Sequence, residues 1–324
     1  MSNPASKKGL TLIELVVVMA IISMLIFLLL PVVQASREVS RRTACSNNLR
    51  QLTLALFSYH DSFKTFPAGF LSDQNSGLRT IDELNPNGWG WFATTLPYLE
   101  RENLAEKLCF AQPMYSPANS PCCNVTFPDF FCPSDSASVS RTFVVAKLDG
   151  TPQWPGDRMS SAWETSLGAT NYVACTGFSR EVQKFPPRFV QFSTNVNRSR
   201  AGIFFNNSRT RIEDIRDGSS NTFLLGERSS NKMYSSWSGA LSISPHHYWL
   251  TLATSELTPN SEDGDMKEFE FALDRGFSSN HPEVSVMSFA DGAVAPIADS
   301  IDSRVFSSLG TIAGRETISD QSWK

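Results

Sequence analysis

An almost uninterrupted apolar segment near the N-terminus constrains this chain more than any other feature of its sequence. Leu15–Leu30 contains a single polar residue, Ser23, and the apolar character extends over Leu10–Val33, interrupted only by Thr11, Glu14 and Pro31. A helix rises 1.5 Å per residue, so about 20 residues cross the roughly 30 Å hydrocarbon core of a bilayer. No other part of the sequence is long and apolar enough to do so. The chain is therefore predicted to enter a membrane once, near its N-terminus.

The remainder of the chain has the composition of a globular protein. The whole chain has 324 residues, of which 41% are hydrophobic and 19% charged, enough to form a core and to exclude a disordered chain. Lys and Arg total 28 against 32 Asp and Glu, and no block of like charge exceeds two residues. This balance excludes a nucleic-acid binder of the basic-patch kind, so no nucleic-acid partner is expected.

Three interpretations of the apolar segment compete. In an ordinary secretory signal peptide, Lys7 and Lys8 would form the basic end, and cleavage after Ala35 would leave Ser36 as the first residue. In an uncleaved signal anchor, the helix would stay in the membrane. In a prepilin, a peptidase would cut before the helix and leave it attached. The third fits best, because KKGLTLIEL at residues 7–15 resembles the type IV prepilin cleavage and methylation motif.

This resemblance implies roles for four residues. Prepilin peptidase would cut after Gly9, on the cytoplasmic side, and leave Leu10 as the N-methylated first residue. Glu14 and Pro31 would become the fifth and twenty-second residues of the mature chain, where the family carries a glutamate and often a proline. Leu10 is the one departure, because phenylalanine is commoner there. Residues 1–9 would form the leader, and residues 10–33 the membrane-spanning and assembly half of one helix.

Glu14 has a physical reason to lie in this segment. A carboxylate inside a bilayer costs on the order of a few kcal/mol and usually marks a function. Cleavage creates an amine on Leu10, and pairing of that amine with Glu14 of a neighbouring subunit would neutralise both charges in an apolar filament core. The alternative is a Glu14 that reaches the interface or is protonated. Pro31 has an alternative too, since it could simply kink the helix where it leaves the membrane.

Beyond Pro31 the helical pattern continues. Apolar residues recur mostly at spacings of three and four, which is typical of an amphipathic helix. They are Ala35, Val39, Cys45, Leu49, Leu52, Leu56, Tyr59 and Phe63. No glycine or further proline occurs before Pro67-Ala68-Gly69, which predicts the end of the helix. Residues 34–66 would form the amphipathic half, and a helix from Leu10 to His60 would be about 75 Å long.

Residues 67–324 are predicted to form a globular head, which makes the whole chain an α+β protein with an antiparallel sheet. Strand-like stretches are short, at 143–146, 171–175, 202–205, 222–226, 247–251 and 284–289. The clearest element is a hairpin of Val284–Phe289 and Ala293–Ile297 that turns at Asp291-Gly292. Residues 148–165 are predicted to be an irregular loop. Trp89 and Trp91 are expected in the core rather than stacked on a sugar.

Several blocks carry a second resemblance, among them RRTACSNNLRQ at residues 41–51, GWGW at 88–91, CPSD at 132–135 and SNHP at 279–282. They resemble a large pilin-like family of planctomycete bacteria, whose C-terminal part is a domain of unknown function. Glu283 and Val284 depart from it, because the family tends to have glycines there. The resemblance implies the architecture of a long helix docked on a head, and it says little about biochemical function.

The six cysteines favour disulfides, because an exported head meets an oxidising environment. Their clustering predicts at least one local bridge, with buried free thiols as the alternative, among Cys109, Cys122, Cys123 and Cys132. No CxxC or Cys/His spacing typical of zinc is present, which argues against a zinc site. An acidic loop with Asp263 and Asp265 offers oxygen ligands of the kind that calcium prefers, although a solvated surface is the simpler interpretation.

No placed nucleophile, GxSxG or HExxH motif is present, so the chain is not predicted to be an enzyme. The sequence predicts a structural subunit of a type IV pilus-like filament or a type II secretion-like pseudopilus. The expected partners are prepilin peptidase, other pilin or pseudopilin subunits, the assembly platform and, before assembly, membrane lipid. The alternative is a membrane-anchored or secreted module that binds a glycan or peptide and uses the leader only for export.

The expected location is the bacterial inner membrane, crossed once with the N-terminus in the cytoplasm, and then a periplasmic or extracellular filament. Basic residues do not decide this orientation, because they lie on both sides of the span, at Lys7 and Lys8 before it and Arg37, Arg41, Arg42 and Arg50 after it. The orientation therefore rests on the leader motif.

Overall fold

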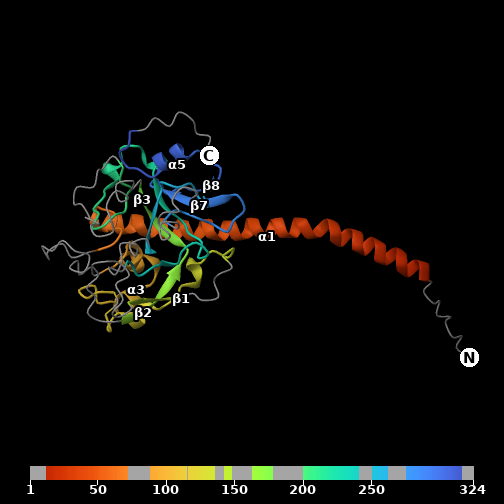
Figure 1. The fold of residues 1–324 in the computed structure, drawn as a ribbon, viewed down its shortest axis with the longest axis horizontal. Helices are drawn as coiled ribbons and strands as arrows, with labels where there is room; N and C mark the ends of the chain where they lie inside the picture. The colour runs from red at the N-terminus through yellow and green to blue at the C-terminus, as the bar shows by residue number, and fades with distance from the viewer. Residues whose placement is uncertain are drawn as a thin grey trace, which may run out of the picture.

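The structure is a computed structural model that describes residues 12–71, 88–114, 116–135, 142–147, 163–177, 200–240, 250–261 and 275–315. In these residues an α+β head is built around the C-terminal half of one long helix, whose N-terminal half projects away from it (Figure 1). Gly9 and Leu10 lie outside the described residues, and so do Asp263 and Asp265.

The long helix α1 covers Leu12–Phe63, which is 52 residues or about 78 Å. It continues through Pro31 and bends within its projecting half (Figure 1). It ends because Lys64 adopts a left-handed backbone, with φ of 60°, and its amide donates to the His60 carbonyl at 2.6 Å. The prediction of one continuous helix is confirmed, with its end at Phe63 rather than His60.

The head buries one face of the second half of α1. Its fully buried side chains there are Cys45, Leu49, Leu52, Thr53, Ala55 and Leu56. The predicted stripe is therefore right in its middle and too long at both ends, because Ala35, Val39 and Phe63 remain exposed. The helix packs against strands β4 (Phe223–Glu227), β7 (Val284–Phe289) and β8 (Val294–Ala298). It also packs against α2 (Trp91–Thr95) and η1 (Leu96–Leu99).

The main sheet has five strands in the order β6-β3-β4-β7-β8. Their bounds are β3 (Tyr172–Gly177), β4 (Phe223–Glu227), β6 (Leu252–Thr254), β7 (Val284–Phe289) and β8 (Val294–Ala298). Neighbouring strands run antiparallel except β3 and β6, which run parallel. The sheet is thus mixed, whereas the sequence predicted an antiparallel one.

A smaller sheet pairs β1 (Thr142–Lys147) with β2 (Trp163–Thr170) and β2 with β5 (Ser235–Ser236), all antiparallel. The start of β2 falls inside the stretch predicted to be a loop, so that prediction is wrong at its C-terminal end. The remaining helical segments are α3 (Glu102–Ala105), α4 (Ser120–Cys123), η2 (Pro128–Phe130), η4 (Ile212–Asp214), η5 (Ser219–Asn221) and α5 (Ser303–Leu309).

Strand β3 shows how the sheet separates two cores. Because successive side chains point to opposite faces, Tyr172 and Ala174 join the core that contains α1, while Val173 and Cys175 join the core beneath α5. Trp89 and Trp91 belong to the α1 core and are at most 1% exposed. Their indole N–H groups donate to the carbonyls of Gln112 and Thr251, each at 3.0 Å. The core role predicted for both tryptophans is confirmed.

The predicted hairpin is also confirmed, as β7 and β8. Asp291 accepts a hydrogen bond from the amide of Ala293 at 2.9 Å, and Gly292 has a φ of 92°. Just before β7, Glu283 has a φ of 62°, in the left-handed region that favours glycine. A glycine would adopt this conformation without strain, whereas the Cβ of Glu283 makes it unfavourable.

Candidate functional site

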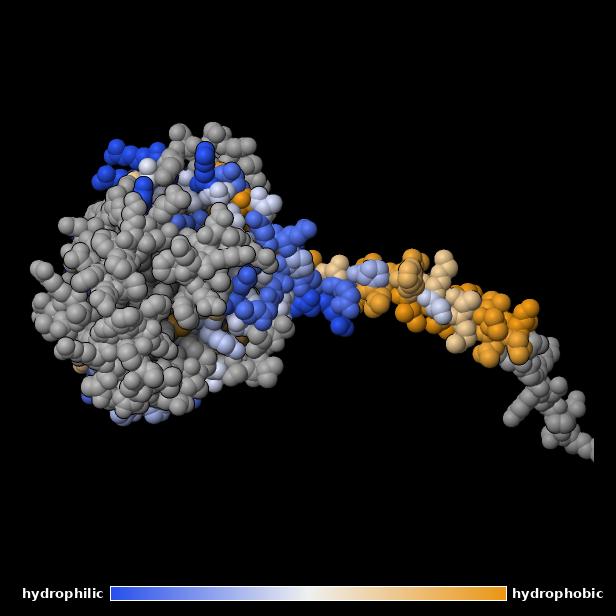
Figure 2. Space-filling view, viewed as in Figure 1, coloured by the Kyte–Doolittle hydropathy of each residue, from blue (hydrophilic) through white to orange (hydrophobic). Residues whose placement is uncertain are grey.

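The residues predicted to act in assembly lie on the projecting half of α1. Glu14 is in its first turn and Pro31 lies within it. Every large apolar side chain from Leu12 to Val33 is exposed, and Phe27 reaches 80%. Figure 2 shows this half as a continuous apolar rod, with hydrophilic residues where the helix enters the head. In the described part of the chain, α1 is the one helix long and apolar enough to cross a membrane.

The cysteines predicted to form a local bridge are free thiols in the structure. Cys109 and Cys122 are partly exposed, whereas Cys123 is buried and its thiol donates to the Met114 carbonyl at 3.3 Å. Burial raises the pKa of Cys123 to about 12. Cys132 is a buried free thiol whose sulfur lies with other residues. No bridge forms among them there, and a local bridge stays a prediction.

Cys132 instead joins a buried group that the sequence analysis did not find. Cys45, Cys132, Glu227 and His281 each direct one sulfur, oxygen or nitrogen atom to a common point, and these atoms all lie within 4.8 Å of one another. We call these four residues the junction cluster, because Cys45 belongs to α1 and the other three belong to the head. All four are buried.

The helix contributes to the cluster through one face. Glu38, Arg41 and Cys45 follow at spacings of three and four, which places them on the same side of α1. Glu38 accepts hydrogen bonds from Arg41 and from the Ser134 hydroxyl. Its other contact is with His281, whose Nδ1 lies 2.5 Å from the Glu38 carboxylate. The beginning of the docked half of α1 is therefore bound to the head by polar contacts.

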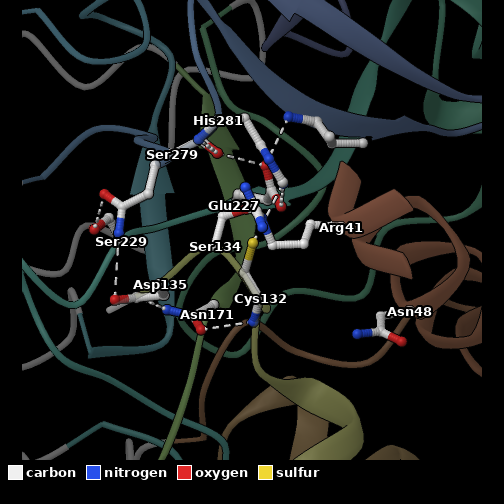
Figure 3. Close-up of polar contacts among 12 residues, drawn as sticks. Arg41, Asn48, Cys132, Ser134, Asp135, Asn171, Glu227, Ser229, Ser279 and His281 are labelled. Atoms are coloured by element: carbon white, nitrogen blue, oxygen red, sulfur yellow. Dashed lines mark hydrogen bonds and ion pairs between the residues drawn. The ribbon is translucent and has the colours of Figure 1, made fainter. Parts of the chain in front are cut away.

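The Cys132–Asp135 segment is fixed by a polar network around Asn171, which lies between β2 and β3. Asn171 accepts a hydrogen bond from the Cys132 amide at 2.9 Å and donates to the Asp135 carboxylate. Asp135 also accepts from the amide and hydroxyl of Ser230. Figure 3 shows the result, with the Cys132 sulfur pointing toward Glu227 and His281 and its backbone held by Asn171.

Glu227 and His281 are positioned by the loop before β7. Glu227, at the end of β4, accepts hydrogen bonds from the Ser279 hydroxyl and the Val286 amide, both at 2.9 Å and both on Oε2. The His281 amide donates to the same Ser279 hydroxyl. His281 Nε2 then lies 3.3 Å from the Cys132 sulfur and 3.5 Å from Glu227 Oε1.

The groups of the cluster shift one another's protonation. Burial alone would lower the pKa of His281, but Cys132, Glu227 and Glu38 raise it to about 11. The hydrogen bond from Cys45 and the contact with His281 lower the pKa of Cys132 to about 7, against the effect of burial. The hydrogen bond to Cys132 and burial both raise the pKa of Cys45. These shifts favour a protonated His281 imidazole and make the Cys132 thiol more acidic than an ordinary cysteine.

A search for local spacing could not have found this cluster. Its members come from a helix, a loop, a strand end and a second loop, so they are not part of any CxxC or His-rich motif in the sequence. The absence of zinc-type spacing in the sequence therefore says little about a metal site assembled from distant segments. The available signal was the presence of one cysteine in block 41–51, one in block 132–135 and a histidine in block 279–282.

Comparison with protein families accounts for nearly the whole chain. Residues 4–30 match the family profile described as Prokaryotic N-terminal methylation motif, and residues 34–304 match the one described as Protein of unknown function (DUF1559). No curated protein and no solved structure matches the chain. The first match indicates a type IV pilin-like precursor, and the second covers most of the head together with the docked half of α1. The chain belongs to the DUF1559 family, the planctomycete pilin-like family predicted from its sequence blocks.

Proposed function

We propose that this protein is a structural subunit of a type IV pilus-like filament or a type II secretion-like pseudopilus. Prepilin peptidase matures it by cutting after Gly9, and Leu10 becomes the methylated first residue. The subunit is stored in the inner membrane, with its N-terminus in the cytoplasm, until an assembly platform adds it to a periplasmic or extracellular filament. Its role is structural rather than enzymatic.

The exposed apolar half of α1 is the observation that carries this proposal. Burying one Leu, Ile, Val, Met or Phe side chain yields about 1.5–3 kcal/mol, so a projecting rod of them is not stable in water. Nothing in the described head covers this rod, since its most apolar window is 0% buried. Membrane lipid can cover it before assembly, and the same half of neighbouring subunits can cover it afterwards.

The continuity of α1 supports a filament over a simple anchor. A membrane anchor needs only the first half of the helix, whereas here the same helix continues into the hydrophobic core of the head. Packing of the first halves into a bundle would therefore hold the heads in a defined position. In this arrangement Glu14 of one subunit pairs with the Leu10 amine of its neighbour, which removes two buried charges at once.

Two measurements test the proposal. Mass spectrometry of the mature protein is expected to find N-methyl-Leu10 as the first residue, and a start at Ser36 would instead establish ordinary secretion. The Glu14→Ala variant is expected to be processed normally and to be missing from sheared, purified filaments. Ser23→Ala, in the same apolar segment, is the matched control and should assemble. Normal filaments from Glu14→Ala would overturn the assembly role. A wild-type chain that stays anchored in the membrane and forms no filament would favour a binding module.

A further inference from the structure

We propose that the junction cluster is a structural zinc site, in which Cys45, Cys132, Glu227 and His281 bind one Zn²⁺ ion and tie α1 to the head. The inference concerns the docked half of α1 and the head, so it stands whether or not the chain forms filaments. It also assigns a use to four buried polar side chains that the proposed filament role does not explain.

The donor atoms have the types and spacing of a tetrahedral zinc site. Zinc binds sulfur at about 2.3 Å and nitrogen or oxygen at about 2.0–2.1 Å, so the edges of such a tetrahedron are about 3.3–3.8 Å long. The Cys132 Sγ–His281 Nε2 distance is 3.3 Å and the His281 Nε2–Glu227 Oε1 distance is 3.5 Å. Since all four donor atoms lie within 4.8 Å of one another, the widest pair has to close by at most about 1 Å.

Glu227 supplies an independent indication of a ligand. The residue is 1% exposed, and its buried Oε1 atom accepts no hydrogen bond of normal geometry, because His281 Nε2 lies 3.5 Å away, whereas Oε2 accepts two. A buried carboxylate oxygen that accepts no good hydrogen bond is costly, and such atoms in a native structure call for an explanation. Oε1 points to the same place as the Cys132 sulfur and His281 Nε2. A cation at that point would satisfy it.

Glu38 prepares His281 for metal binding. Ligand histidines almost always donate their second ring N–H to a carboxylate or carbonyl, which fixes the ring and its tautomer. Here Nδ1 of His281 is 2.5 Å from the Glu38 carboxylate, so a proton on Nδ1 leaves the Nε2 lone pair directed into the cluster. Glu38 is thus a positioning residue, and it comes from the same helix as Cys45.

The types and number of ligand atoms indicate which metal the site would bind and that the metal would be structural. Two thiolates with an imidazole suit zinc, whereas calcium and magnesium require oxygen ligands. Four protein ligands fill the tetrahedron, which is characteristic of a structural rather than a catalytic zinc site. On binding, Zn²⁺ displaces any proton held by the Cys45 and Cys132 sulfurs or by His281 Nε2, and these protons pass to solvent, while Nδ1 keeps its proton.

Metal analysis of the full chain tests the inference. The protein is exported in a bacterial host, purified from membranes in detergent without chelator, and analysed by inductively coupled plasma mass spectrometry. One zinc ion per chain is expected for the wild type and only background zinc for Cys45→Ser/Cys132→Ser. The matched control is Cys123→Ser/Cys175→Ser, which removes two equally buried thiols outside the cluster and should retain the metal.

A second measurement on the wild type covers the case in which the double variant fails to fold. After chelation, added Co²⁺ is expected to produce the thiolate charge-transfer and visible bands of a tetrahedral site, which Zn²⁺ then bleaches. With free Zn²⁺ about 100-fold above its Kd, Tm should rise by about 5–10 °C. Glu38→Ala should weaken zinc affinity about 10–100-fold.

Three results would overturn the inference. The first is retention of zinc by Cys45→Ser/Cys132→Ser, because the metal would then lie elsewhere. The second is a Cys45–Cys132 disulfide found by peptide mapping of the freshly purified, metal-free protein, because those sulfurs would then be a covalent bridge. The third is free thiols that give no cobalt spectrum and no zinc-dependent change in Tm.

Discussion

The two halves of α1 belong to one helix, yet one half exposes its apolar side chains and the other buries them. From Leu12 to Val33 every large apolar side chain is exposed, with Met24 at 67%, whereas Leu49, Leu52 and Leu56 are 0% exposed. Both halves contain similar apolar residue types, but the spacing of these residues along the helix differs. Where apolar residues surround the helix, no described part of the chain covers it; where they form a stripe, the chain's own head covers it.

The largest effect is expected from one substitution made in both halves. Leu52→Ala should lower the free energy of unfolding of the head by about 2–5 kcal/mol, because it leaves a cavity in the α1 core. Leu25→Ala should leave the unfolding midpoint unchanged. Urea unfolding in detergent, followed by the fluorescence of the buried tryptophans, measures both. Equal destabilisation by the two variants would contradict the division of α1 into an external and a docked half.

Substitution by a charged residue should have its larger effect in the projecting half of α1 instead. Leu25→Arg is expected to reduce insertion into the membrane, since an arginine at the centre of a span costs about 2.5–3.5 kcal/mol on insertion scales. Leu54→Arg provides the matched control, because Leu54 is 68% exposed on the outer side of the docked half. The membrane-bound fraction of each variant after export is the measurement. Undiminished insertion of Leu25→Arg would show that this half is not held in lipid.

A smaller effect is expected at the boundary between the halves. Glu38→Ala should lower the free energy of unfolding by about 1–3 kcal/mol, because Arg41 and the buried His281 lose their shared acceptor. The comparison variant is Glu213→Ala, which removes an exposed ion pair with Arg211 and should cause no measurable change. If the two variants had equal denaturation midpoints, the docked half would be held by apolar packing alone.

The elements predicted correctly are those that local sequence determines. The periodicity of α1 and the Asp-Gly turn between β7 and β8 act over a few residues, so each is visible without the rest of the fold. The Trp89 and Trp91 prediction needed only the preference of large aromatic side chains for the core. The family of the chain was predicted from motifs of the same local kind.

The errors arise where distant segments decide the outcome. Residues 202–205 have strand-like composition, but they form no strand in the structure, and Gly202 approaches the backbone of Gly177 instead. Residues 163–165 belong to β2 through pairing with β1, which composition did not reveal. The junction cluster is the extreme case, since Cys45 and His281 are brought together only by the packing of α1 against the sheet.

The distance between Glu38 and His281 along the chain has a consequence for the timing of folding. They are separated by 243 positions, and β7, against which α1 packs, follows His281 directly. Helix α1 is synthesised first but can dock only after β7, one of the last elements, has been made. Contacts of such high sequence separation form slowly. If the head is exported as proposed, the docking face of α1 stays open until the C-terminal strands have crossed the membrane. In that case the unfolded subunit needs protection from aggregation at the membrane surface until β7 packs against α1.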